Sequence, residues 1–410
     1  MDFKPFRPLR PVAELASRLV TPPYDVVSTP EARAYAGDEP LSFLRVTRSE
    51  LELPDGANAY APEVYEHARD TLKRLVAEGA LVRESRPVYA VYRQTRGARA
   101  QIGIAGLASV AEYEAGLVKK HEFTRAEKED DRTRHIDVTS AQTGPVFLAM
   151  RANDALLQLL TAMTLARPDL DAWMQNGVRH EAWLVPADSP RGAKLAALLA
   201  AEPASYIADG HHRAASAARV AKLRHARGEG AGDWDQFLAV VFPSRWLEIL
   251  PYNRVVADLG GHDEAALLAA IGEHFEVGAP GASPTPSARH HVAMYLGGVW
   301  RELVAKNVDE ADPINSLDVA LLQDRLLGPV LGITDPRRDH RIDFVGGIRG
   351  TAELELRAGR SGVAFSMFPT SLDELFRVAD ADLIMPPKST WFEPKLADGL
   401  FVHAFAGSEE

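Results

Sequence analysis

Five consecutive residues, Asp209-Gly-His-His-Arg213, combine an acid, a glycine, two imidazoles and a guanidinium. The residues before them, Ser205–Ala208, are typical of a short strand, and the Ala- and Arg-rich run after them predicts a helix from Arg213. A strand that turns directly into a helix exposes unpaired N–H groups and the positive end of the helix dipole. The stretch therefore predicts an anion site, in which Gly210 permits close approach and Arg213 grips a phosphate.

A simpler interpretation of this stretch is a helix start capped by Asp209 with polar residues at the surface. A cap needs the carboxylate alone and explains neither histidine nor the arginine. We therefore favour the anion site.

A second polar stretch runs from Lys119 to Ile136. Thr124 and Glu127 have the spacing of a capping box, so we expect a helix from about Arg125. That helix would have a charged face at i, i+3, i+4 and i+7, either solvated or part of a site, formed by Lys128, Asp131, Arg132 and His135.

A third stretch, Met385-Pro-Pro-Lys-Ser-Thr390, places an ammonium and two hydroxyls on a loop stiffened by prolines. It ends like a Walker loop, but prolines replace the glycines that let a backbone wrap a phosphate. The loop therefore predicts contacts from side chains, and not a phosphate-binding backbone.

Other chemistries are disfavoured by spacing. His121-Glu122 lacks the second histidine of the H-E-x-x-H zinc motif, and the adjacent His211 and His212 are a poor ligand pair for one ion. No G-x-S-x-G elbow occurs, and the absence of cysteine removes thiolate sites. The three polar stretches instead supply the cations, carboxylates and helix N–H groups that phosphoryl transfer needs.

Composition limits the class of protein. The 410 residues carry a net charge of −11, which argues against nucleic acid and anionic membranes as partners. No run approaches 18 apolar residues, and the N-terminus lacks the apolar run of a signal peptide, so we expect a cytoplasmic protein that does not contact a membrane.

The periodicity of apolar residues predicts a mixed α/β fold. Expected helices span residues 61–80, 154–166, 169–175, 191–201, 315–326 and 371–380. Expected strands span 88–92, 101–110, 182–185, 237–242, 246–250, 363–368 and 399–404, with a hairpin over 290–305. The composition break at 278–288 predicts three regions: 1–85 packing on the core, the core at 86–277, and an α/β region at 289–410.

Several motifs together resemble an uncharacterised bacterial and archaeal family labelled ParB-like. They are Ala208-Asp-Gly-His-His-Arg, Lys120-His-Glu-Phe-Thr, Asp131-Arg, Leu250-Pro-Tyr-Asn-Arg and Met385-Pro-Pro-Lys-Ser-Thr. The first is similar to the phosphate-binding motif of the ParB and sulfiredoxin superfamily, and within it to that of free-serine kinases. The resemblance implies a ParB/sulfiredoxin-like nucleotide-binding core with additional N- and C-terminal α/β regions.

The resemblance implies a kinase that uses ATP or ADP with Mg²⁺ to phosphorylate a hydroxyl metabolite, with free L-serine as the best candidate. Glu122 would be the general base, and Asp209 would hold Mg²⁺ or orient the hydroxyl. The expected phosphate contacts are Gly210, His211, His212, Arg213, Lys120 and Arg132. The expected substrate contacts are Thr124, Lys388, Ser389 and Thr390.

The chain departs from two members of that superfamily. It has no cysteine for sulfiredoxin chemistry, and it lacks the basic helix-turn-helix pattern of partition proteins, which argues against DNA clamping. The alternative function is a nucleotide-binding switch or adaptor without metabolic kinase activity. The expected partners are a nucleotide and a small substrate, and a homodimer stays open.

Overall fold

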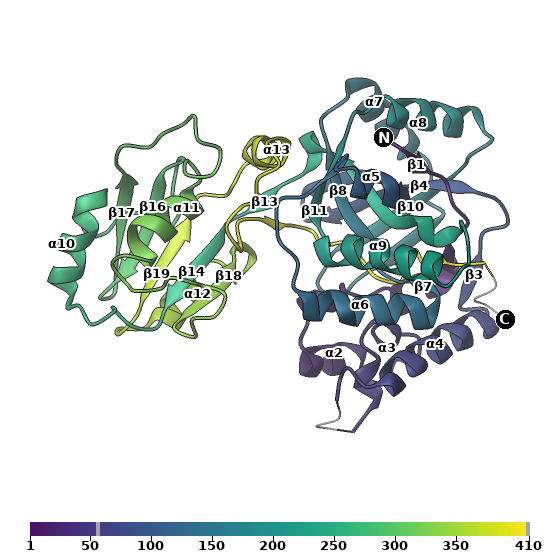
Figure 1. The fold of residues 1–410 in the computed structure, drawn as a ribbon, viewed down its shortest axis with the longest axis horizontal. Coiled ribbons are helices and arrows are strands. Elements are labelled where there is room, and N and C mark those ends of the chain that lie inside the picture. The colour runs from purple at the N-terminus through teal and green to yellow at the C-terminus, as the bar shows by residue number, and fades with distance from the viewer. Residues whose placement is uncertain (55–57, 407–410) are drawn as a thin grey trace. The chain divides into compact units, whose positions relative to one another are not determined.

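The computed structural model describes residues 1–54 and 58–406, which form two compact units (Figure 1). Unit 1 comprises residues 1–247 and 394–410, and unit 2 comprises residues 248–393. The stretch at 278–288, expected to separate regions, lies inside unit 2. The end of the chain returns to unit 1. The predicted mixed α/β class is confirmed.

Unit 1 is built on a mixed sheet, for which nine strands are found among the described residues. Their order is β6 (Val118–Lys119), β11 (Ser205–Asp209), β8 (Val146–Met150), β12 (Gln236–Pro243), β5 (Arg99–Ser109), β4 (Val88–Arg96), β10 (Arg179–Pro186) and β9 (Leu170–Trp173), with β1 (Phe3–Lys4) on β5. Two pairs are parallel, β6 with β11 and β8 with β12. β12 is buried along almost its whole length, as its continuous apolar run predicts.

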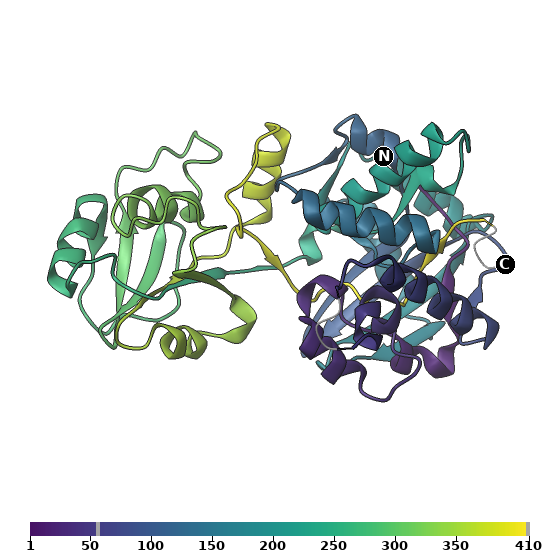
Figure 2. The same cartoon turned by 60° about the horizontal axis from the view of Figure 1, so that its bottom comes forward.

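Helices cover this sheet in Figure 1 and Figure 2. α6 (Ala126–Thr139) packs against both α9 (His211–Ala226) and α4 (Pro62–Ala77). The other helices of unit 1 are α1 (Ala16–Leu19), α2 (Thr29–Ala36), α3 (Leu44–Thr47), α5 (Val110–Glu114), α7 (Asp154–Met163) and α8 (Pro190–Ala200). α4 begins at a proline and buries one apolar stripe, as predicted.

The C-terminal segment that begins at residue 394 pairs with parts of unit 1 that are far away in the sequence. Val402 pairs with Leu9, and Asp398 pairs with Thr21, through isolated bridges. β21 (His403–Ala404) pairs with β7 (Ala141–Gln142), and β2 (Leu9–Pro11) pairs with β3 (Leu81–Arg83). Contacts between the two ends of the sequence therefore complete unit 1.

Unit 2 contains an antiparallel sheet. Its order is β15 (Phe275–Val277), β17 (Val299–Ala305), β16 (His291–Leu296), β19 (Val363–Met367), β14 (Tyr252–Val256) and β18 (Ile342–Gly346). A separate pair joins β13 (Ile249–Leu250) to β20 (Trp391–Phe392). The helices are α10 (Glu264–His274), α11 (Asp318–Leu322), α12 (Ala352–Ala358) and α13 (Leu372–Asp380).

Two local predictions were wrong, and two predicted strands have other bounds than expected. Residues 170–173 form β9 and not a helix, because buried Leu170 and Ala172 alternate with exposed neighbours. The capping box at α6 does not form, because Arg125 and not Thr124 is the N-cap; the Thr124 hydroxyl donates to Glu129. The strands at 88–92 and 101–110 are longer than expected and turn at Gly97, whose φ is +57°.

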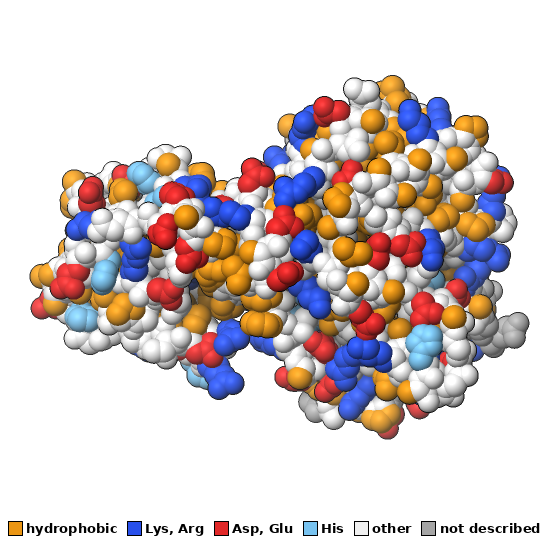
Figure 3. Space-filling model, turned by 45° about the horizontal axis from the view of Figure 1, so that its top comes forward, with side chains coloured by type: hydrophobic (Ala, Val, Ile, Leu, Met, Phe, Trp, Pro, Cys, Tyr) orange, Lys and Arg blue, Asp and Glu red, His pale blue; other side chains and the backbone are white. Residues whose placement is uncertain are grey.

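No helix in the described part of the chain is long and apolar enough to cross a membrane. On the face drawn in Figure 3, acidic and basic side chains are interspersed.

Candidate functional site

The site in unit 1 is organised by the start of α9. β11 ends at Asp209, and α9 begins at His211, two residues earlier than the sequence predicts. Between them Gly210 has a φ of +92°, which favours glycine, and a Cβ there would lie 3.2 Å from the Arg213 guanidinium. No side chain caps the helix. The direct strand–glycine–helix turn that the sequence predicts is therefore present.

Both carboxylate oxygens of Asp209 accept hydrogen bonds from cations. Lys395 Nζ donates to Oδ1 at 2.9 Å, and Arg213 Nη2 donates to Oδ2 at 3.0 Å. Burial alone would raise the pKa of Asp209, but the charges of Lys395 and Arg213 outweigh it and hold that pKa well below its usual range. This pairing differs from the expected role of Asp209 as a Mg²⁺ ligand.

Arg213 is 6% exposed and binds acceptors from three parts of unit 1. Besides Asp209, its guanidinium donates to Asp25 Oδ2 at 3.0 Å and to the carbonyl of Pro145. Its Nε is buried without a hydrogen-bond partner among the described residues. The Arg213 guanidinium, which was expected to hold a phosphate, thus donates to groups of the protein itself. It links the turn at Asp25 to the start of α9.

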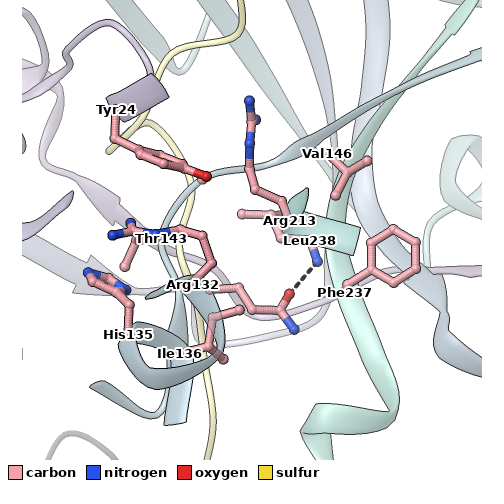
Figure 4. Close-up of a pocket in the computed structure, with 11 residues that line it drawn as sticks. Tyr24, Arg132, His135, Ile136, Thr143, Val146, Arg213, Phe237 and Leu238 are labelled. Atoms are coloured by element: carbon pink, nitrogen blue, oxygen red, sulfur yellow. Dashed lines mark hydrogen bonds between the residues drawn. The ribbon is translucent and has the colours of Figure 1, made fainter. Parts of the chain in front are cut away.

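A small cavity of about 20 Å³ lies beside Arg213 and is drawn in Figure 4. Arg132 lines it, ion-paired with Asp131 at 2.9 Å and 4.2 Å above the Tyr24 ring. A water needs ~10–15 Å³, so this cavity has room for a water and is too small for a nucleotide. The expected charged face of α6 is partly internal, because Asp131 and His135 are buried.

Asp398 is a buried acid that lies near Tyr24, Asp25 and Arg213, and these residues are called the Arg213 cluster below. Its Oδ2 accepts a hydrogen bond from the Tyr24 amide at 3.1 Å. Burial raises the pKa of Asp398 to about 7, although the positive charge of Arg213 opposes the rise. Asp398 therefore titrates near neutral pH.

The loop of residues 120–125 lies against the start of α9. The Arg125 amide donates to His212 Nε2 at 3.0 Å. His211 Nδ1 lies 3.9 Å from Glu122 Oε2, and the His211 ring meets the His121 ring edge-on with centroids 4.6 Å apart. Two of the three predicted polar stretches thus meet in unit 1.

The histidines of this contact are neutral at pH 7. Burial lowers the pKa of His121 to about 4, and a hydrogen bond with the backbone of Ile207 only partly offsets that effect. Burial, reinforced by the neighbouring His121, lowers the pKa of His211 well below its usual value. Neutral imidazoles can accept hydrogen bonds or bind metals.

Of the remaining predicted residues, Lys120 and Thr124 lie in the same loop, and the others lie in unit 2. Lys120 is exposed, with its ammonium 4.1 Å above the Tyr113 ring. In unit 2, Lys388 has a φ of +60° and lies 5.3 Å from the Tyr252 ring. The neighbouring Ser389 hydroxyl donates to the Pro386 carbonyl at 2.6 Å, and Thr390 precedes β20. The substrate role of the Lys388–Thr390 loop stays a prediction.

Sequence reasoning missed Lys395 and two charged residues of the Arg213 cluster, Asp25 and Asp398. Asp25 comes after Pro22-Pro23-Tyr24, in a rigid turn whose sequence also fits a plain connector. Lys395 lies seven residues after Lys388, outside the Met385–Thr390 motif. Asp398 carries no motif, and only its burial distinguishes it.

Several solved structures have a low similarity to the chain. A mutant of free serine kinase in complex with ADP shares 13% identity over 70% of this chain and 86% of that one, with a TM-score of 0.35. A conserved hypothetical protein from Pyrococcus furiosus shares 13% over 71% and 92%, with a TM-score of 0.35. SbnI with a C-terminal truncation, from Staphylococcus aureus, shares 12% over 72% and 85%, with a TM-score of 0.37. These scores are too low to assign a function.

No curated protein matches the chain. A family model described as "Protein of unknown function (DUF1015)" matches residues 3–320, which include all of the candidate site except the C-terminal segment and the Lys388–Thr390 loop. That description does not carry the ParB-like label expected from the motifs. Because the match spans more than half of the sequence, the chain belongs to the DUF1015 family.

Proposed function

We propose that unit 1 carries a nucleotide-dependent phosphotransferase site that acts on a hydroxyl group of a small metabolite, with free L-serine as the best candidate. The observation that carries this proposal is the position of Glu122 against the start of α9, where Asp209 is paired with Lys395. A helix N-terminus and an ammonium attract phosphate, and a nearby carboxylate can accept a hydroxyl proton. The choice of serine comes from the similarity of the Asp209–Arg213 motif to free-serine kinases.

In this proposal, accessible groups would contact the phosphate and the acceptor hydroxyl, and buried groups would position them. The N–H groups at the start of α9 would bind phosphate oxygens, with Gly210 permitting close approach. The ammonium groups of Lys395 and Lys120 would balance the phosphate charge. Glu122, whose side chain is 42% exposed, would take the proton from the acceptor hydroxyl. The buried Arg213 would position Asp209 and leave the phosphate to the other groups.

The nucleotide would be ATP or ADP, with Mg²⁺ held mainly through the phosphates, as is usual for this ion. In the observed arrangement each oxygen of Asp209 accepts one hydrogen bond, from Lys395 or from Arg213, so Asp209 would reach Mg²⁺ only through its remaining lone pairs. Its role in the proposal is to hold Lys395 toward the start of α9.

The test is incubation of the full chain with ATP or ADP, Mg²⁺ and L-serine, with detection of phosphoserine by mass spectrometry. Glu122→Gln is expected to lower turnover by ~10²–10⁴-fold while nucleotide still raises the melting temperature. Glu114→Gln is the matched control, because that side chain is also 42% exposed and pairs with Lys222 on the surface of unit 1. Lys388→Ala tests the predicted substrate role of the unit 2 loop through a raised KM.

The outcomes separate the two candidate functions. Loss of product with retained nucleotide binding supports the kinase. Nucleotide binding without phosphoserine, unaffected by Glu122→Gln, supports the switch or adaptor. If no nucleotide changes the melting temperature and no product forms, both functions are wrong.

A further inference from the structure

We propose that His121, Glu122 and His211 form a binding site for a divalent transition-metal ion. One ligand atom from each residue lies within 4.8 Å of the other two. Ligand atoms around a tetrahedral Zn²⁺ are roughly 3.4 Å apart, given metal–ligand distances of about 2.1 Å. A small rotation of side chains therefore closes the site. The proposal goes beyond the phosphotransferase function, because it needs neither a nucleotide nor a hydroxyl substrate.

The donor set selects the class of metal. Two imidazoles and one carboxylate suit Zn²⁺, Co²⁺ or Fe²⁺, and such sets commonly leave a position for water or substrate. Mg²⁺ prefers oxygen ligands in a near-octahedral arrangement, which two imidazole nitrogens do not supply. This site is therefore distinct from the Mg²⁺ that would accompany a nucleotide.

The surroundings of His121 and His211 hold both imidazole rings in place for metal binding. His121 is 2% exposed and forms a hydrogen bond with the backbone of Ile207 in β11. Metal-binding histidines usually use one ring nitrogen for such a bond, which orients the other toward the ion. His211 is 5% exposed, and its Nε2 is buried with no hydrogen-bond partner in the described part of the chain. Nδ1 of the same ring is 3.9 Å from the Glu122 carboxylate, beyond hydrogen-bond range.

Access to the site comes from the side of Glu122. Its side chain is 42% exposed, whereas both histidines are buried. An ion bound there would be held by two fixed ligands and one adjustable ligand. It would also occupy the carboxylate assigned as general base, so Zn²⁺ is expected to inhibit any phosphotransferase activity.

The experiment is a titration of the metal-free full chain with Co²⁺, followed by visible absorption. Co²⁺ absorption intensifies when coordination changes from octahedral to tetrahedral, so a protein site is seen directly. We expect one equivalent to bind with intensified absorption and to be displaced by Zn²⁺. His211→Ala and Glu122→Gln are each expected to weaken Co²⁺ binding by about 100-fold or more, since loss of outer partners alone costs ~10–100-fold.

His225→Ala is the matched control, because His225 is exposed in the same unit and pairs with Asp235 at 2.5 Å. It should bind Co²⁺ as the unaltered chain does. Glu122→Gln changes a partly exposed side chain and keeps its shape, so this variant remains informative if His211→Ala fails to fold. Melting curves of each variant verify folding.

Octahedral-type absorption only, or equal Co²⁺ affinity in Glu122→Gln and the unaltered chain, would overturn the proposal. The readout contains no nucleotide. Failure of the phosphotransferase assay with intact Co²⁺ binding would therefore count against the proposed function alone.

Discussion

Two helix starts in this chain are completed in opposite ways. At α13, the Ser371 hydroxyl accepts from the Glu374 amide, and the Glu374 carboxylate accepts from the Ser371 amide, so neighbours satisfy each other. At α9, Gly210 provides no side-chain cap, and the groups around the start come from Asp25 and Lys395, 188 and 186 residues from their partners. A start closed by its own residues stabilises a helix. The start of α9 is instead surrounded by charged residues that are far away in the sequence.

The largest expected effect tests whether Arg213 joins the remote groups. Arg213→Met leaves Asp25 and Asp209 without their shared buried cation, and we expect it to lower the free energy of unfolding by ~3–5 kcal/mol. Denaturant titration measures the loss. Arg219→Met on the same helix removes an exposed pair with Asp130 and should cost less than ~1 kcal/mol. Equal losses of unfolding free energy in the two variants would mean that the buried ion pairs of Arg213 stabilise the fold no more than an exposed ion pair does.

The second prediction concerns the pH dependence that Asp398 brings to the α9 region. Burial raises the pKa of Asp398 in the folded state to about 7, from an ordinary value of 3.8, so the folded state favours the protonated form. Stability from this group is full below pH 4 and is lost as pH rises toward 7, by at most ~1.4 kcal/mol per pH unit. Asp398→Asn should flatten this part of a melting-temperature profile. An unchanged slope would assign the dependence to other groups.

The third prediction tests whether the turn into α9 is special. Gly210→Ala is expected to cost ~1–2 kcal/mol for the left-handed backbone and more for the contact with Arg213. Gly228→Ala follows the same helix at a φ of +82° with open space around it, so it measures the backbone cost alone. Denaturant titration of both variants gives the difference. If the two costs agree, the contact with Arg213 is immaterial.

The smallest expected effect concerns the start of α13, which is capped by its own residues. Ser371→Ala removes the cap of α13 and is expected to cost about 1 kcal/mol, whereas Ser371→Gly should cost only a few tenths. The same denaturant titrations measure both. Nucleotide binding should not change in either variant, and a loss of binding would contradict the assignment of the ligand site to unit 1.

Local patterns predicted much of the fold. The hairpin at Gly297-Gly298, the helix at 61–80 and the capping box at Ser371 are confirmed, because each depends on residues close in sequence. The capping box at Thr124 failed, because α6 starts at Ala126 with Arg125 as its N-cap, one residue later than the pattern predicts. The helix expected at 169–175 failed because pairing with β10 imposes a strand.

In the candidate site, too, the features that depend on neighbouring residues were predictable, and the contacts between distant residues were not. The sequence by itself determined the strand, the glycine turn and the helix around Asp209–Arg213, because backbone preferences and hydrophobic periodicity act over a few residues. Only the tertiary structure decided that Arg213 is buried and donates to Asp25, that Lys395 pairs with Asp209, and that His121 and Glu122 meet His211. Those contacts join positions far apart in the chain. Their pairing depends on how the sheet and helices pack, which residue type and spacing do not encode.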